Sequence, residues 1–199
     1  MKRVFVALVA VLALALSGCS QVDDAASVGD TQISLDQLQT QVDSILAERA
    51  KVDTSQMQLQ EGEELTRSQL SFLISNVIIE AIADDAGIEI SKSDLDAYKI
   101  EIYQNIGGEE MLPSVLVNAA IAPEGLDAAL RRDLILQKLT TAATEAGSDD
   151  AAVNSLIQKL FNDKANELKI SINPRYGVWD AETLSIVDKE PAGGAVTDK

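Results

Sequence analysis

Histidine is absent from this sequence of 199 residues, and cysteine occurs once, at Cys19. The chain therefore lacks the commonest general base and the commonest metal ligand of proteins. A single cysteine cannot form an intramolecular disulfide. The sequence also has no GxSxG or SxxK motif and no glycine-rich phosphate loop. Its acidic pairs fit solvated positions in a leader and at helix ends: Asp23-Asp24, Asp84-Asp85 and Asp149-Asp150. We expect no enzyme activity, no cofactor and no metal.

Basic residues are also scarce. The 16 Lys and Arg are outnumbered by 32 Asp and Glu, which gives a formal net charge of −16. A chain of this charge is repelled by the phosphates of nucleic acids and by anionic lipid headgroups. We therefore expect no nucleic-acid partner and no membrane adhesion through side-chain charge.

One long apolar run is present, at the N-terminus. It extends from Val4 to Leu16 after the basic residues Lys2 and Arg3. The run is shorter than the roughly twenty residues that span a bilayer and is typical of a secretory signal peptide. It ends in residues 16–19, Leu-Ser-Gly-Cys, which resemble a bacterial lipobox. The resemblance implies cleavage before Cys19 and a diacylglyceryl group on the Cys19 side chain. An ordinary signal peptide with a chance cysteine is the alternative.

Four regions follow from this interpretation. We predict a signal peptide at residues 1–18, a lipidated tether at 19–25, one helical domain at 26–187 and a flexible tail at 188–199. Loss of the signal peptide removes two of the 16 basic residues, so the net charge becomes 14 − 32 = −18. Attachment to the extracytoplasmic face of the cell membrane then depends on the lipid, because two acyl chains anchor a protein stably.

The stretch from Leu65 to Gly87 organises the predicted fold. Its apolar residues recur three and four positions apart, as on a helix face: Leu70, Leu73, Ile74, Val77, Ile78, Ala81 and Ile82. Phe72 and Ile79 widen the apolar stripe, so more than one side of this helix needs cover. Gly87 can adopt the left-handed conformation that ends a helix. We expect the other helices to wrap around this one.

Helical periodicity also marks most of the remaining chain. The predicted helices cover residues 34–50, 91–106, 109–120, 124–143 and 149–168. Residues 169–173 alternate polar and apolar side chains, as a half-buried strand does, and their expected partner is the extended element near Val28–Ile33. Residues 178–187 are expected to be irregular. The predicted fold is mostly α, with about five to six helices and one small two-stranded ribbon that pairs the chain ends.

The order of these segments resembles the N-terminal chaperone domain of SurA-type proteins. The resemblance is carried by VGDTQIS at 28–34 leading into a helix, by the step at 86–91 with its acidic helix start, and by the helix at 126–139. Residues 172–179 resemble the strand and turn that close such domains in actinobacterial lipoproteins. The likeness covers about residues 26–187 and implies a helical domain that binds unfolded or extended polypeptides.

One departure from that family limits what the resemblance implies. SurA and PrsA relatives usually carry a parvulin prolyl-isomerase domain between the last two helices, where this chain has only residues 144–148. Isomerase activity is therefore not expected. The expected function is that of a membrane-anchored holding chaperone. A structural or adaptor lipoprotein that binds one folded envelope partner is the alternative.

Two short segments, 98–111 and 112–121, have more apolar residues than short surface helices need. We expect them to pack edge-on against the central helix and to leave a groove with an apolar floor and an acidic rim. The candidate client-binding residues are Tyr98, Tyr103, Met111, Leu116 and Val117. Phe72 and Ile79 are better explained as core residues. Trp179 and Tyr176 are expected to pack the closing turn onto the helices.

Overall fold

The computed structural model describes residues 23–180 and 182–188. The elements in chain order are β1 (Asp24–Val28), β2 (Thr31–Ser34), α2 (Leu35–Arg49), α3 (Gly62–Ala86), α4 (Lys92–Ile106), η1 (Glu109–Met111), α5 (Leu112–Asn118), η2 (Pro123–Gly125), α6 (Leu126–Glu145), α7 (Asp150–Leu168), β3 (Ser171–Ile172), β4 (Val178–Asp180) and β5 (Ser185–Val187). The mostly helical fold predicted from the sequence is confirmed. The predicted signal peptide, Cys19 and most of the predicted tail lie outside the described residues. No helix of the described residues is long and apolar enough to cross a membrane.

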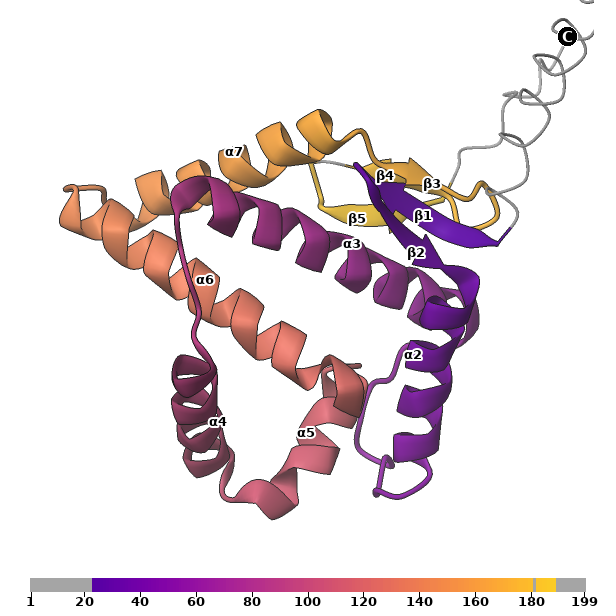
Figure 1. The fold of residues 1–199 in the computed structure, drawn as a ribbon. Helices are drawn as coiled ribbons and strands as arrows, with labels where there is room; N and C mark the ends of the chain where they lie inside the picture. The colour runs from indigo at the N-terminus through magenta and orange to yellow at the C-terminus, as the bar shows by residue number, and fades with distance from the viewer. Residues whose placement is uncertain (1–22, 181, 189–199) are drawn as a thin grey trace, which may run out of the picture.

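Helix α3 runs through the middle of the molecule (Figure 1). Its side chains Leu65, Leu70, Ile74, Ile78 and Ile79 are almost completely buried. Helices α2, α6 and α7 and the strands β1, β2 and β5 all contact it. Gly87 ends the helix with a φ of 64°, as predicted. The central role of this helix and the core position of Ile79 are confirmed.

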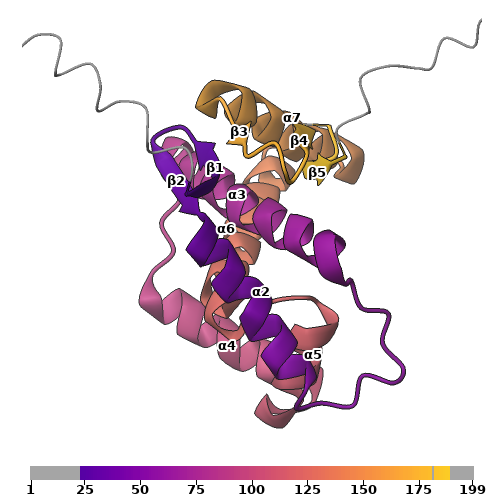
Figure 2. The ribbon, with the colours of Figure 1, turned by 90° about the vertical axis from the view of Figure 1, so that its right-hand side faces the viewer.

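Helices α4 and α5 depart from the prediction that every helix wraps α3. Helix α4 has no buried residue and packs on α6, η1 and α5. Helix α5 packs on α2 and α4. The predicted helix at 109–120 is divided into η1 and α5, with Pro113 in the first turn of α5. In Figure 2, α4 and α5 form the lower part of the molecule, away from the strands.

The pairing of the two chain ends is confirmed, in a larger sheet than predicted. Strand β1 lies between β2 and β3 in an antiparallel sheet of order β2-β1-β3. The β3 partner is Ala26–Ser27 of β1, whereas the predicted partner region centred on residues 28–33. That region instead forms the hairpin of β1 with β2, because Gly29 has the positive φ, 58°, that the first central residue of a type II′ turn needs.

A second hairpin, β4–β5, replaces the irregular segment predicted at 178–187. Trp179 pairs with Ile186 in this hairpin. The Ile186 N–H donates a hydrogen bond to Ser71 Oγ of α3, 3.1 Å away, and the Ile186 side chain is buried. Three-residue strands carry too little pattern to be recognised in sequence, and packing on α3 orders them here. Trp179 and Tyr176 pack against the core cluster, as expected.

Candidate functional site

A groove of about 630 Å³ lies along the side of α3 that the other helices leave open. The β1–β2 hairpin and the start of α2 form one wall, with Val28, Asp30, Thr31 and Gln37. The first turns of α6 and α4 form the opposite wall, with Asp127, Ala128, Arg131 and Leu95. Leu168, at the end of α7, also lines the groove. Segments that are distant in sequence thus enclose one surface of α3.

The floor of this groove is apolar. Leu73, Val77 and Ala81 are four residues apart, so they lie above one another on one face of α3. All three are half-buried, whereas Ile74 and Ile78 on the adjoining face are fully buried. A helix that is apolar on more than one side needs cover on each of those sides. Here the described residues leave one of these apolar sides partly exposed to solvent.

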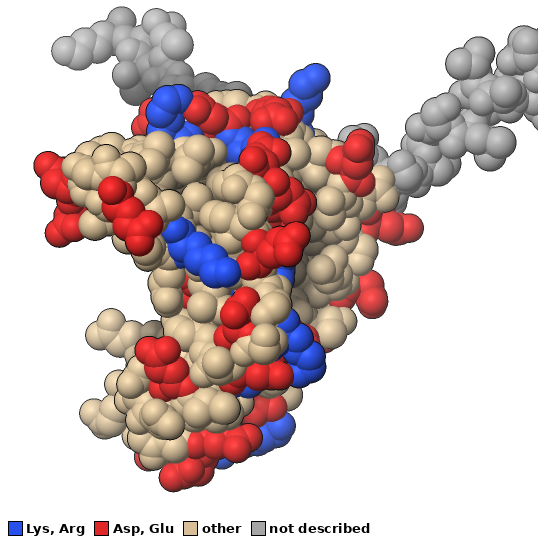
Figure 3. All heavy atoms as spheres, turned by 60° about the vertical axis from the view of Figure 1, so that its left-hand side comes forward, with Lys and Arg blue, Asp and Glu red and all other residues tan. Residues whose placement is uncertain are grey.

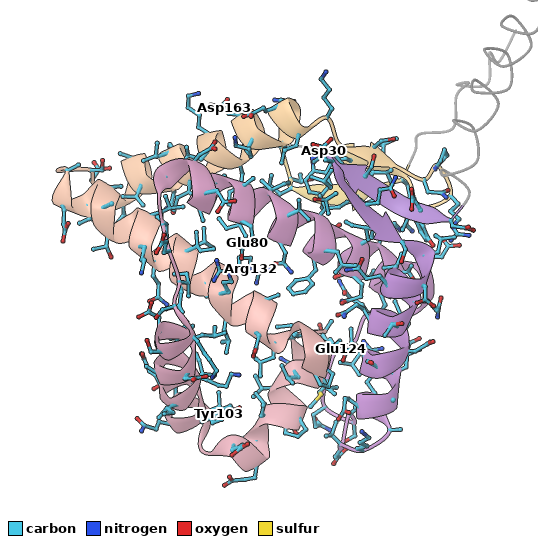
Figure 4. All side chains as sticks on the ribbon, in the orientation of Figure 1. Asp30, Glu80, Tyr103, Glu124, Arg132 and Asp163 are labelled. Atoms are coloured by element: carbon cyan, nitrogen blue, oxygen red, sulfur yellow. The ribbon has the colours of Figure 1, made fainter. Side chains whose placement is uncertain are left out.

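The rim of the groove is acidic. Its lining includes Asp30, Glu80, Asp84 and Asp127 with a single base, Arg131, so the formal charge is +1 − 4 = −3. Figure 4 shows Glu80 between α3 and α6, and Asp30 at the tip of the hairpin. Among the described residues no cation pairs with Asp30 or Asp84. Figure 3 shows acidic side chains over much of the visible face, with fewer Lys and Arg between them.

Arg131 links α6 to α3 and to the segment that precedes α4. Its Nε lies 2.6 Å from Glu80 Oε1, and its Nη1 donates to the Ile90 carbonyl oxygen at 2.9 Å. The hydrogen bond to Glu80 raises the pKa of Arg131. Lys99 of α4 similarly reaches Asp127 Oδ1 of α6 at 2.7 Å. These two partly exposed ion pairs connect α6 to α3 and to α4 on this side of the groove.

The predicted client-binding residues lie elsewhere. None of the five lines the groove. Leu116 and Val117 are 6% and 1% exposed on the side of α5 that packs inward, so the prediction that they offer a binding surface is wrong for this structure. The short helix α5 packs on α2, α4 and η1, and Leu116 and Val117 are its buried residues.

The other three candidates remain partly accessible on the α4–η1 side. Tyr98 is half-buried, and its hydroxyl accepts a hydrogen bond from Gln137 Nε2 at 3.0 Å, so it packs on α6. Burial raises the pKa of Tyr98. Tyr103 is half-buried near the far end of α4, well below Glu80 in Figure 4. Met111 is 45% exposed.

Sequence reasoning missed the residues that do line the groove. Leu73, Val77 and Ala81 belong to the predicted apolar stripe of the central helix, and the prediction that the other helices wrap this helix has these residues covered. The signal in the sequence was the width of that stripe. Phe72 does not line the groove; it is half-buried, with the Arg132 guanidinium 5.3 Å from its ring centroid.

The groove has no apparent catalytic or metal-binding constellation. Within residues 23–180 and 182–188, no three Asp, Glu, Cys or His side chains are placed to hold a metal ion. The polar groups that line the groove are four carboxylates, the Arg131 guanidinium, the Thr31 hydroxyl and the side-chain amides of Gln37 and Asn76. The arrangement suits binding through apolar contact and charge.

Sequence comparison identifies the family of this domain. The family described as the SurA-like N-terminal domain matches residues 1–140, which extend from the N-terminus into α6. No curated protein matches the chain in a sequence search. The match covers more than half of the 199 residues and agrees with the helical architecture. The chain therefore belongs to the SurA-like N-terminal domain family, a family of chaperone-type, non-catalytic domains.

Proposed function

We propose that this protein is a holding chaperone that binds unfolded or extended polypeptides in the groove along α3. The observation that carries the proposal is the half-exposed apolar floor of Leu73, Val77 and Ala81 beneath an acidic rim. Burial of about 100 Å² of apolar client surface would contribute about 2.5 kcal/mol. Much of that is offset by the entropy lost on association. Weak binding with fast release is what a holding chaperone requires.

Charge favours a particular kind of client. The groove lining has a formal charge of −3 and the whole chain −16. Apolar client segments flanked by Lys or Arg would gain from this field, whereas acidic segments would be repelled. The same charge keeps a loaded complex soluble.

The proposal includes attachment to the extracytoplasmic face of the cell membrane through lipid on Cys19. Its support is the lipobox-like sequence at 16–19. The described chain begins at Asp23, immediately before β1. A lipid on Cys19 would thus hold the domain close to the membrane by its β-sheet end.

We further propose that the protein has no prolyl-isomerase activity. Helices α6 and α7 are joined by residues 146–149 alone, which leaves no space for an inserted parvulin domain. A proline-limited refolding reaction should therefore proceed at its uncatalysed rate. Acceleration in proportion to the amount of added protein would contradict this part of the proposal.

The holding function is tested with an unfolded client whose aggregation is followed by light scattering. The chain with Cys19→Ser, produced from residue 19, should slow aggregation at stoichiometric excess without ATP. Ala81→Glu places a carboxylate on the apolar floor and should abolish most of this effect. Ala81→Gln separates the effect of charge from that of size. Leu156→Glu is the matched control, since Leu156 is 41% exposed on α7 and does not line the groove.

Two outcomes would reject the proposal. If Ala81→Glu suppresses aggregation as well as the unaltered chain does, the groove is not the binding surface. If the unaltered chain fails to suppress aggregation but binds one folded envelope protein, the adaptor function is correct. Circular dichroism of each variant shows whether the helices are intact.

A further inference from the structure

Within the described residues β2 has a free edge, and its first residue, Thr31, lies in the groove wall. Strand β2 is the edge strand of the sheet β2-β1-β3, and within the described residues it pairs with β1 alone. Thr31 is the first residue of β2, and Gln37 follows β2 in α2. Both residues line the groove. In Figure 1, β2 is the strand of this sheet farthest from β3. An edge strand presents backbone donors and acceptors that can pair with another chain.

The register of the sheet shows which of these groups are free. Val28 and Thr31 flank the two-residue turn, so they exchange backbone hydrogen bonds. The next pair, Ser27 and Gln32, must then point its backbone groups away from each other. Ser27 accordingly faces β3, where it pairs with Ser171. The N–H and C=O of Gln32 face the open edge, and the described residues offer them no partner.

Side-chain alternation determines how an added strand would lie. Ile33 and Val28 are buried toward the helices, whereas Gln32 is exposed on the outer side. A client residue opposite Gln32 would likewise direct its side chain outward. The client residues before and after it would direct theirs inward, toward the floor formed by Leu73, Val77 and Ala81.

We propose that an extended client segment binds by adding a strand to the edge of β2 at Gln32, with alternate apolar side chains on the α3 floor. The inference rests on the proposed holding function and specifies how the client is recognised. The preferred segment has an apolar–any–apolar pattern with Lys or Arg nearby. Charge complementarity supports this occupant, because Asp30 and Asp84 border the groove and no cation of the described residues pairs with either.

The test uses a fluorescent peptide of alternating valine and threonine with lysine at each end. Its binding to the full chain, as isolated from the producing cell, is measured by fluorescence anisotropy. A series of peptides then carries one backbone N-methyl group at successive positions. Methylation at the position opposite Gln32 removes a ladder hydrogen bond and should weaken binding about tenfold. Methylation of either neighbour, whose N–H points away from β2, should change it by less than about threefold.

Two variants of the chain give an independent test. Gln32→Pro removes the free N–H at an edge position where proline is tolerated, so binding should fall about tenfold while the thermal unfolding midpoint remains. Gln32→Ala retains the backbone donor and should bind as the unaltered chain does. A loss of binding in Gln32→Ala equal to that in Gln32→Pro would overturn the proposal.

Other outcomes separate this inference from the holding function. If the peptide binds and N-methylation weakens binding equally at every position, strand addition is wrong while groove binding stands. If the peptide fails to bind yet aggregation is still suppressed, strand addition is again wrong. If both assays fail, the holding function itself is rejected.

Dimerisation that increases with concentration and is lost in Gln32→Pro would show a second copy at the edge. Binding that appears only after removal of residues 189–199 would show the chain's own end there. Either of these last two results would overturn the proposal.

Discussion

The pKa of Asp133 depends on how deeply its side chain is buried in the folded chain. Asp133 lies on α6, half-buried, with the Arg132 guanidinium Nε 3.7 Å from its Oδ1. Burial raises the pKa of the Asp133 carboxyl, and Arg132 only partly opposes this. The ionised form is therefore less favourable in the folded chain than in the unfolded chain.

This shift predicts a pH dependence of stability. A carboxyl whose pKa is raised on folding binds more protons in the native state, so the free energy of unfolding falls as pH rises from the ordinary value of 3.8 through the raised value. Asp133→Asn removes the carboxyl and, with it, this fall in the free energy of unfolding. The variant should be at least as stable as the unaltered chain at pH 7, and its advantage should shrink toward pH 4.

Urea unfolding at both pH values measures the difference. The exposed Asp43→Asn is a control, because it lies on α2 far from Arg132 in sequence. An advantage of Asp133→Asn that is larger at pH 4 than at pH 7 would contradict the assigned direction.

Among the elements, α3 and the β1–β3 pair have distinct roles. Helix α3 supplies the largest share of fully buried side chains, whereas β1 and β3 join the two ends of the domain. Asn173 strengthens that junction: its N–H donates to the Ala25 carbonyl oxygen at 2.9 Å, and its Nδ2 donates to the Asp24 carbonyl oxygen at 3.0 Å.

Asn173→Pro should destabilise the domain, because it removes both hydrogen bonds at a paired position of a short ladder. We expect a loss of at least about 2 kcal/mol, since each hydrogen bond contributes about 1 kcal/mol. Asn173→Ala retains the backbone donor and should cost about 1 kcal/mol. Thermal melts of the two variants make the comparison. Equal melting temperatures would show that the backbone bond between β1 and β3 contributes nothing.

The core of α3 predicts a larger effect. Ile74 is completely buried, so Ile74→Ala should cost about 2–5 kcal/mol through lost burial and the cavity left behind. Ile100→Ala is a matched change on α4, where the side chain is 58% exposed, and should stay within about 0.5 kcal/mol. Denaturant unfolding of both variants checks the prediction. A cost at Ile100 comparable to that at Ile74 would mean that the α4 surface is covered in solution.

At the scale of the whole molecule, the proposed lipid anchor and the acidic domain have separate tasks. The chain carries a formal charge of −16, and charge alone would keep it away from anionic lipid. The proposed attachment would then depend on acyl chains. The domain would be free to present its groove to the proposed clients.

Cys19→Ala tests the proposed lipid anchor. The variant should lack lipid and should no longer partition with membranes after an alkaline wash. Mass spectrometry of the unaltered protein should show the added lipid on its N-terminal residue. Membrane retention of a Cys19→Ala chain that also lacks residues 4–16 would contradict the lipid anchor.

Local sequence determined most of the helices and their ends. Ser34 accepts a hydrogen bond from the Gln37 N–H at 3.0 Å, and Ser91 with Asp94 forms the predicted capping box. Such caps, helical periodicity and Gly87 act within a few residues, so they can be recognised without the fold. The central position of α3 followed from the width of its apolar stripe.

The tertiary structure alone decided which apolar residues stay accessible. Leu116 and Leu95 look alike in sequence, yet Leu116 is buried on α5, which packs on α2 and α4, while the half-buried Leu95 lines the groove. Likewise, the β1–β3 pair and the short β4–β5 hairpin depend on contacts made across long stretches of chain. Exposure and strand pairing are set by where separate elements meet in space, and a local pattern does not contain that information.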